Sequence, residues 1–263
     1  MDGGDDGGYS CALAFTIPAE ALMQPGKIVR AAAVCLVAAG SVPLVGCAHQ
    51  MAGAAANALT PAEQAAGWKL LFDGRTTAGW RGYRMDSMPA GWQVVDGALT
   101  RVSGGGDIMT RDKYRDFELS LEWKVAPGGN SGVFYRASED DDAIYWSAPE
   151  MQVLDDAVHP DGRSRLTAAG SDYGLYPAPA GVVKPAGQWT WFRIVVRGNH
   201  VEHWMNGVKV VEYELGSPDW EAKVKASKFA PHPHYGRNAE GYIGLQDHGD
   251  RVAYRNVKIR VLP

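Results

Sequence analysis

Residues 117–123 read FELSLEW, and this alternation of apolar and polar side chains decides the fold. Successive side chains of a β-strand point to opposite faces of a sheet, so the apolar residues face a core and Glu118, Ser120 and Glu122 face away from it. Short segments of this kind recur between turns, a pattern typical of an all-β sandwich of two antiparallel sheets. The ten predicted strands are Gly91 to Val95, Ala98 to Val102, Phe117 to Val125, Gly132 to Ala137, Pro149 to Leu154, Thr190 to Arg197, Val201 to Met205, Lys209 to Glu214, Tyr242 to His248 and Ala253 to Val261.

Two turns and one helix complete the expected framework. Asp96-Gly97 and Asn206-Gly207 each stand between two predicted strands, and these dipeptides favour tight hairpin turns. The segment Asp219 to Phe229 is the one plausible helix, with Trp220 and Val224 four residues apart on one face. We expect this helix to cover a sheet edge.

Composition narrows the classes of function. The 263 residues are 46% hydrophobic, enough for a sizeable core, and the formal net charge of -4 comes without a basic cluster, so we expect no nucleic-acid partner. All three cysteines, Cys11, Cys35 and Cys47, precede residue 50. The rest of the chain therefore has no disulfide, no thiolate metal site and no cysteine nucleophile.

The beginning of the chain resembles a bacterial lipoprotein signal. Lys27 to Arg30 is basic, Ala31 to Val45 is small and apolar, and Leu44-Val45-Gly46-Cys47 has the order of a lipobox. A buried core helix is the alternative interpretation of this apolar stretch. A membrane span needs about 20 residues, and about 15 apolar residues are too few for one. We expect Cys47 to carry a lipid that anchors the protein to a membrane.

The same signal divides the chain into three parts. Residues 1–46 are an upstream extension and signal peptide with Met23 as the suspected start, residues 47–66 are an Ala-rich tether, and residues 67–263 are the folded domain. Ala48 follows the cysteine in place of the Asp that retains many lipoproteins in the inner membrane. We therefore expect an exported protein at the outer membrane, facing the periplasm or the cell surface.

Alternation also places four polar side chains on outward faces. Met151 and Val153 take the core side of their strand, which leaves Glu150 and Gln152 outward. The same reasoning leaves Gln246 and His248 outward after Ile243 and Leu245. A solvated sheet also has a polar face, but a carboxyl, two amides and an imidazole are more varied than an ordinary wet surface. This variety of side chains favours a functional site on that face of the sheet.

Several motifs resemble the 3-keto-disaccharide hydrolase domain family, from about Gly67 to the C-terminus. They are Leu71-Phe72-Asp73-Gly74, Gly79-Trp80, the hairpin Trp92 to Leu99, Phe117-Glu118-Leu119 with Glu122-Trp123, Asn130-Ser131-Gly132-Val133-Phe134 with Arg136, Glu150 to Asp155, and Gly241 to Gly249 with Arg255-Asn256-Val257. The resemblance implies a concanavalin A-like jelly roll in an exported bacterial enzyme that acts on 3-keto-glycosides. Ala148-Pro149 departs from the aromatic residue that often precedes this strand in the family, so the resemblance does not extend to fine substrate preference.

The implied chemistry starts at the keto group. A ketone at C3 acidifies the hydrogen on C2, so a base can remove it, the C1 oxygen leaves by β-elimination, and water adds to the enone. This route needs a base, a stabiliser for the enolate oxygen and an acid or metal at the leaving group. We expect Glu150 or His248 to be the base and Arg136 to stabilise the enolate, while Gln152 and Gln246 hold sugar hydroxyls.

Further expectations complete the site. We expect Glu122, Asp155, Tyr173 and Arg255 to contact the substrate, and a divalent metal is left open as a cofactor. Because the substrate is an oxidised sugar, the family chemistry also implies a functional link to a sugar 3-oxidoreductase.

Two other functions remain in view. An ordinary glycosidase would use two carboxylates, because Glu150 to Asp155 resembles the acidic strand of jelly-roll glucanases, although Gln152 cannot titrate and Asp155 lies on the other face. A lectin-like module would need only aromatic rings for stacking on sugars, for which Tyr145-Trp146 and Tyr173 to Tyr176 are candidates.

Two short motifs could bind metal. Asp140-Asp141-Asp142 offers oxygen ligands for calcium, but an acidic surface loop is the simpler interpretation. His232-Pro233-His234 is better interpreted as a solvated loop than as a metal site.

Overall fold

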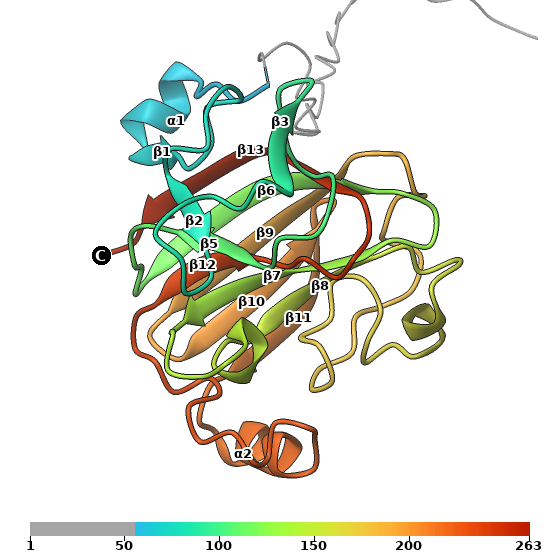
Figure 1. Cartoon of the computed structure of the whole chain (residues 1–263). Helices are drawn as coiled ribbons and strands as arrows, with labels where there is room; N and C mark the ends of the chain where they lie inside the picture. Colours follow the sequence, from blue (N-terminus) through green and yellow to red (C-terminus); the bar gives the residue numbers. More distant parts are fainter. Residues whose placement is uncertain (1–55) are drawn as a thin grey trace, which may run out of the picture. The chain divides into compact units, whose positions relative to one another are not determined.

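The computed structural model describes residues 56–263, which form a sandwich of two antiparallel sheets (Figure 1). The larger sheet has the spatial order β11 (Val208–Glu214), β10 (His200–Met205), β9 (Thr190–Arg197), β6 (Phe117–Val125), β13 (Val252–Val261), β4 (Ala98–Arg101) and β3 (Trp92–Val95), with β1 (Trp68–Leu70) also paired to β13. The smaller sheet has the order β2 (Trp80–Gly82), β5 (Ile108–Thr110), β12 (Tyr242–Leu245), β7 (Asn130–Ala137) and β8 (Glu150–Leu154). The expected all-β sandwich is confirmed.

The alternation of side chains explains most of these strands. In β9, buried residues alternate with half-buried ones along nearly the whole strand, and the buried set packs into the core between the sheets. All ten predicted strands are present. Strands β1, β2 and β5 were not predicted, because three residues are too few to show a period of two.

Both predicted hairpins have the expected turn geometry. Asp96 and Gly97 have φ values of 51° and 73°, and Asn206 and Gly207 have φ values of 49° and 85°. Positive φ at both central residues defines the turn that matches the twist of the flanking strands.

Four short helical segments accompany the sheets: α1 (Pro61–Ala65), η1 (Ile144–Trp146), η2 (Pro160–Arg163) and α2 (Pro218–Lys225). Helix α2 is the predicted helix, although it begins one residue earlier and ends before Phe229. Its first turn is capped by Ser217, whose side chain accepts a hydrogen bond from the Trp220 backbone N–H. Trp220 and Val224 are buried as expected.

Residues 57–66, expected to be part of a tether, are attached to the sandwich. The Asn57 side chain donates a hydrogen bond of 2.8 Å to the carbonyl of Gly97, and its oxygen accepts one of 2.8 Å from the backbone of Asn256. Glu63 in α1 forms an ion pair with Lys258 of β13. The folded body therefore includes residues 57–66 as well as the part from Gly67 onward, because side-chain contacts distant in sequence hold this stretch. Cys47 and the signal peptide lie outside the described residues.

A buried polar cluster lies between the two sheets. The Tyr135 hydroxyl lies 2.8 Å from Nε2 of His203, and Nδ1 of His203 lies 3.1 Å from the carbonyl of Gly170. His203 is fully buried. Burial lowers the pKa of His203 to about 4, because a charged imidazole would lose its hydration there.

This histidine is expected to make the fold sensitive to acid. The unfolded chain binds the His203 proton near the ordinary pKa of 6.5 and the folded chain only near 4, so the unfolded state holds more protons between these values. The free energy of unfolding contributed by this group should fall by up to about 3 kcal/mol as the pH drops through that window. Urea unfolding at pH 4.5 and pH 7 should show a smaller difference in His203→Gln than in the wild type. Equal pH differences in both proteins would contradict the expectation, and the comparison cancels the opposite effect of buried acids.

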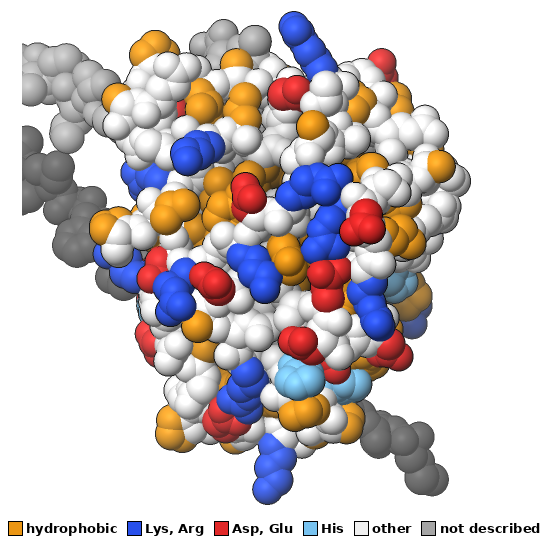
Figure 2. Space-filling view, turned by 60° about the vertical axis from the view of Figure 1, so that its left-hand side comes forward, with side chains coloured by type: hydrophobic (Ala, Val, Ile, Leu, Met, Phe, Trp, Pro, Cys, Tyr) orange, Lys and Arg blue, Asp and Glu red, His pale blue; other side chains and the backbone are white. Residues whose placement is uncertain are grey.

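The surface drawn in Figure 2 has a mixed character. Positive and negative side chains are interspersed with hydrophobic ones, and no large area of one charge stands out on this face. Within residues 56–263, no helix combines the length and the apolar character needed to cross a membrane.

Candidate active site

A row of side chains crosses the outer face of the smaller sheet. Gln152 of β8 pairs with Gly132 of β7, and the Gln246 N–H after β12 donates a hydrogen bond of 3.0 Å to the Gly132 carbonyl. Because directly paired residues point to the same face, Gln152 and Gln246 flank Gly132 from either side. This row forms the floor of a pocket.

Glu150 lies over the glycine in that row. A Cβ atom added to Gly132 would lie 2.0 Å from Oε1 of Glu150, so only glycine leaves room for the carboxyl group at this place. Glu150 is 5% exposed. Among the described residues, no group donates a hydrogen bond to its carboxyl oxygens, which leaves them available to a ligand.

Loops from three parts of the chain form the walls. The segment after residue 167 runs beside β8, where the Tyr173 N–H donates a hydrogen bond of 3.0 Å to the Glu150 carbonyl. Tyr145 and Trp146 come from η1, and Lys228 follows α2. The pocket has a volume of about 330 Å³, at the lower end for small-molecule sites. Its lining residues are Asn130, Tyr145, Trp146, Glu150, Gln152, Tyr173, Lys228, Gln246 and His248.

Three amide side chains in the lining carry oxygens without partners. Within residues 56–263, Oδ1 of Asn130, Oε1 of Gln152 and Oε1 of Gln246 are buried and accept no hydrogen bond. Buried polar atoms are normally satisfied, so unsatisfied ones gathered in one pocket indicate a ligand with several hydrogen-bonding groups. A sugar, with its hydroxyls, has this chemistry.

Burial sets the charge of Glu150. It raises the pKa of Glu150 to about 8, with Asp107 and Asp172 adding to the effect and Lys228 opposing it. Burial in turn lowers the pKa of Lys228, against the attraction of Glu150 and Asp161. A carboxyl with a pKa this high is a stronger base, once ionised, than an ordinary exposed glutamate.

Asp107 is a second acid near the pocket. It precedes β5, where Ile108 pairs with Leu245, so the register places Asp107 beside Gln246 on the same face. Its Oδ1 accepts a hydrogen bond of 2.8 Å from the Asp247 N–H. Burial raises the pKa of Asp107 to about 6.

The structure brings together five of the nine site residues expected to bind or act on a substrate: Glu150, Gln152, Tyr173, Gln246 and His248. Tyr145 and Trp146, expected only for a lectin-like site, line the same pocket. His248 is exposed at its rim.

Arg136 is the main correction to the expected site. Its guanidinium donates hydrogen bonds to the carbonyls of Gly198 and Arg115 and lies 3.7 Å from Asp116, away from the pocket lining. Arg136 has a φ of 55°, next to a shift of register between β7 and β12. The irregularity interrupts the alternation of β7, and the Arg136 side chain lies beside Asp116 rather than in the pocket.

Glu122, Arg255 and Asp155 also lie outside the pocket lining. Arg255 forms an ion pair of 2.6 Å with Glu122 on the larger sheet and lies 4.1 Å from the ring centroid of Trp189. Asp155 accepts hydrogen bonds from the N–H groups of Gly128 and Ala157, and so holds the turn after β8.

Sequence reasoning missed Asn130, Lys228 and Asp107. Asn130 could have been found, because it lies two residues before Gly132 and shares its face of the strand. Lys228 gives no such signal, since Lys223 and Lys225 precede it and nothing in the sequence distinguishes the three.

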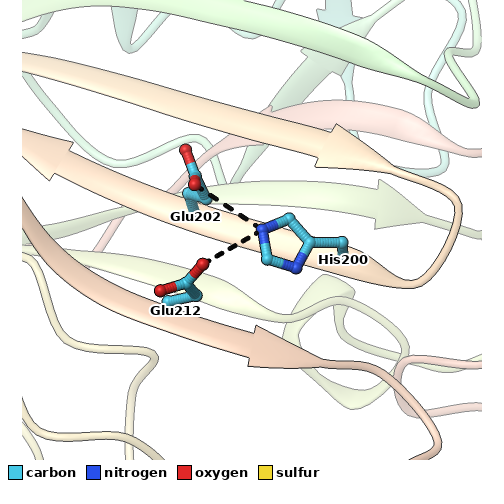
Figure 3. A group of neighbouring side chains, drawn as sticks. All are labelled: His200, Glu202 and Glu212. Atoms are coloured by element: carbon cyan, nitrogen blue, oxygen red, sulfur yellow. Dashed lines mark ion pairs between the residues drawn. The ribbon is translucent and has the colours of Figure 1, made fainter.

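Potential metal ligands lie elsewhere. Among the described residues, His200, Glu202 and Glu212 are the group close enough to share an ion (Figure 3). A hydrogen bond to Glu214 raises the pKa of His200, and Lys209 forms ion pairs with Glu202 and Glu212. The two carboxylates are therefore already paired with His200 and Lys209, in a partly exposed network on β10 and β11.

The two motifs considered as metal sites have structural contacts. His234 Nδ1 lies 3.2 Å from Oδ2 of Asp141, and the His232 ring stacks on Trp146 with centroids 3.7 Å apart. Both loops therefore support the aromatic wall of the pocket.

The fold is similar to that of two crystal structures described as proposed glycosyl hydrolases. One from Parabacteroides distasonis ATCC 8503 has a TM-score of 0.74 and 33% identity, covering 80% of this chain and 100% of that chain. A second from the same organism has a TM-score of 0.62 and 32% identity, covering 74% and 99%. The sandwich is thus shared with proteins described as proposed glycosyl hydrolases.

The sequence comparison is more specific. A 3-keto-disaccharide hydrolase of Bacteroides thetaiotaomicron is 39% identical to this chain, covering 74% of it and 79% of that relative. Residues 67–260 match the 3-keto-alpha-glucoside-1,2-lyase-like domain. The chain belongs to this family and is homologous to an enzyme.

Proposed function

We propose that this protein cleaves 3-keto-glycosides, including 3-keto-disaccharides, by removing the C2 proton, eliminating the C1 oxygen and adding water. The observation that carries the proposal is the pocket itself: a buried carboxyl with a raised pKa, a lysine and three unsatisfied amides converge there. Membership of the family supplies the substrate class.

The position of each residue in the pocket gives its role in the proposed reaction. Glu150 lies at the floor and is the base that removes the C2 proton. Lys228 replaces Arg136 as the basic side chain that activates the 3-keto group. Gln152 and Gln246 hold hydroxyls, and His248 at the open rim delivers a proton to the leaving oxygen. Trp146 and Tyr173 offer rings for the apolar faces of the sugar.

One assay tests the proposal. The full chain is incubated with a 3-keto-disaccharide and, separately, with its parent disaccharide, and monosaccharide release is followed. We expect release from the keto sugar alone. Binding of the sugar without release of monosaccharides would indicate a lectin-like module rather than an enzyme.

An ordinary glycosidase with two carboxyl groups is the second candidate, and Asp107 is the observation that favours it. Asp107 lies close enough to Glu150 for its charge to add to the raised pKa of that carboxyl, and inverting glycosidases use two carboxyl groups about 6.5–9.5 Å apart. Release from the parent disaccharide would support this reading.

The pH profile should report the ionisation of Glu150. Only the ionised carboxyl can accept the C2 proton, and its pKa is raised to about 8. We therefore expect kcat/KM for the keto sugar to rise nearly tenfold per pH unit below pH 8 and to level off above it. Initial rates from pH 6 to pH 9 measure this. A profile that is flat between pH 6 and pH 8 would exclude Glu150 as the base.

We also propose that the protein is exported and anchored by a lipid on Cys47, at the outer membrane or the cell surface. The lipobox Leu44 to Cys47 supports this. Mass analysis of natively produced protein should show a lipidated N-terminus at Cys47, and an unprocessed chain would refute it. An enzyme that oxidises sugars at C3 must supply the substrate.

A further inference from the structure

Lys228 has surroundings unlike those of the lysines that form ion pairs with carboxylates. Its Nζ lies 4.3 Å from the ring centroid of Tyr173, 5.2 Å from that of Phe229 and 5.6 Å from that of Tyr145. The fourth ring, that of Trp146, is 6.0 Å away. Among the described residues, no carboxylate lies within ion-pair distance of this amine. It is therefore an amine bordered by aromatic rings that faces a polar pocket.

Other lysines of the chain show the contrast. Lys223, five residues earlier, forms an ion pair of 2.6 Å with Asp219, and Lys209 forms one of 2.7 Å with Glu212. The hydrogen bond to Glu212 raises the pKa of Lys209. Burial acts on Lys228 in the opposite direction and lowers its pKa, although Glu150 and the rings favour the charge. A larger share of Lys228 is thus available as the free amine.

A free amine in a pocket for ketones can act as a nucleophile. Desolvated lysines react with carbonyl carbons to form Schiff bases, and the positive iminium nitrogen attracts electrons more strongly than a neutral ketone oxygen. Removal of a proton from the neighbouring carbon then becomes easier. Glu150 lies in the same pocket and can take that proton.

We propose that Lys228 forms a covalent iminium with C3 of the keto sugar, an inference that rests on the proposed function. The free Lys228 amine bonds to C3. The keto oxygen takes one hydrogen from the amine and one proton from solvent and leaves as water, and the nitrogen keeps its second hydrogen; the solvent proton is returned when the iminium is hydrolysed. Glu150 accepts the C2 proton, and the C2–H electron pair forms an enamine.

The enamine then expels the leaving group. The C1–O bond breaks, and its oxygen takes a proton from His248 or from protonated Glu150, leaving a conjugated iminium. Water adds at C1 while C2 regains a proton, and a second water hydrolyses the iminium to the keto sugar and free Lys228. One water is released and two are consumed, so the sum is hydrolysis of one glycosidic bond.

The test is reductive trapping in the wild-type full chain. The protein turns over a 3-keto-disaccharide in the presence of sodium cyanoborohydride, which reduces iminium ions in preference to ketones. We expect one reduced sugar adduct on the peptide that contains Lys228, and loss of activity in step with its formation. The parent disaccharide and a sample without sugar should give no adduct.

Two variants sharpen the result. Lys228→Arg keeps the positive charge but cannot form this iminium, so the adduct should vanish and kcat should fall about 100-fold or more. Lys225→Met, at the exposed end of α2, should keep both adduct and activity. Activity of Lys228→Arg within a few-fold of the wild type would overturn the proposal.

The outcomes separate this inference from the proposed function. Sugar release without an adduct on Lys228 overturns the iminium and leaves the function standing. An adduct without release supports the reactive lysine and overturns the hydrolysis. If the experiment gives neither an adduct nor sugar release, both the iminium and the proposed function are overturned.

Discussion

Replacing Glu150 with Gln is expected to lower kcat for a 3-keto-disaccharide by about 10²–10⁴-fold. The amide keeps the shape of the side chain but cannot accept a proton from C2. Because the described residues donate no hydrogen bond to the carboxyl, the substitution breaks no protein contact, and it removes the cost of burying an ionisable group. The melting temperature should therefore stay the same or rise.

The matched control for this variant is Glu122→Gln. Glu122 lies on the other sheet in an ion pair with Arg255, so its loss should leave kcat unchanged. Activity of Glu150→Gln within tenfold of the wild type would transfer the role of base to another group, with His248 the first to examine.

Adding a single methyl group at Gly132 should cost nearly as much activity. In Gly132→Ala the new Cβ would lie 2.0 Å from Oε1, 2.7 Å from Cδ and 2.9 Å from Cγ of Glu150, all too close for non-bonded atoms. The carboxyl must move by about 1 Å, and displacement of a catalytic group by that amount costs about 100-fold in rate. We expect kcat to fall by this factor.

A glycine in an open loop provides the comparison. Gly104 has no atom within 4 Å of an added Cβ, so Gly104→Ala should be neutral. Circular dichroism and melting temperature should show that Gly132→Ala is folded. Full activity in folded Gly132→Ala would mean that the position of Glu150 over the glycine is not required.

The parts of the site that obey strand alternation could be predicted from sequence. Glu150 and Gln152 lie where a period of two places them, because β8 pairs with β7 without a shift of register. Gln246 also lies where expected, because it follows β12 beyond the irregular part of that strand. Arg136 does not, because a residue with positive φ beside a shifted register has no sequence signature strong enough to reveal it. Local irregularity is thus the limit of this kind of prediction.

Other features required tertiary information. The path of the loop after α2 brings Lys228 into the same pocket as Glu150, and no periodicity describes that path. Asp107 precedes a strand of only three residues, and its place beside Gln246 follows from pairing with β12. The attachment of Asn57 to Asn256 likewise joins residues at opposite ends of the domain. Contacts between segments distant in sequence determine the positions of Lys228, Asp107 and Asn57.

Strand β13 has a consequence for how the protein is made. It pairs with β6, β4 and β1, so it lies inside the larger sheet although it comes last in the chain. A nascent chain that lacks residues 252–261 has β6 and its neighbours on one side and the β3–β4 hairpin on the other, with no strand between them. The larger sheet can close only once β13 is in place, and loss of those ten residues removes the middle of the sheet rather than its edge.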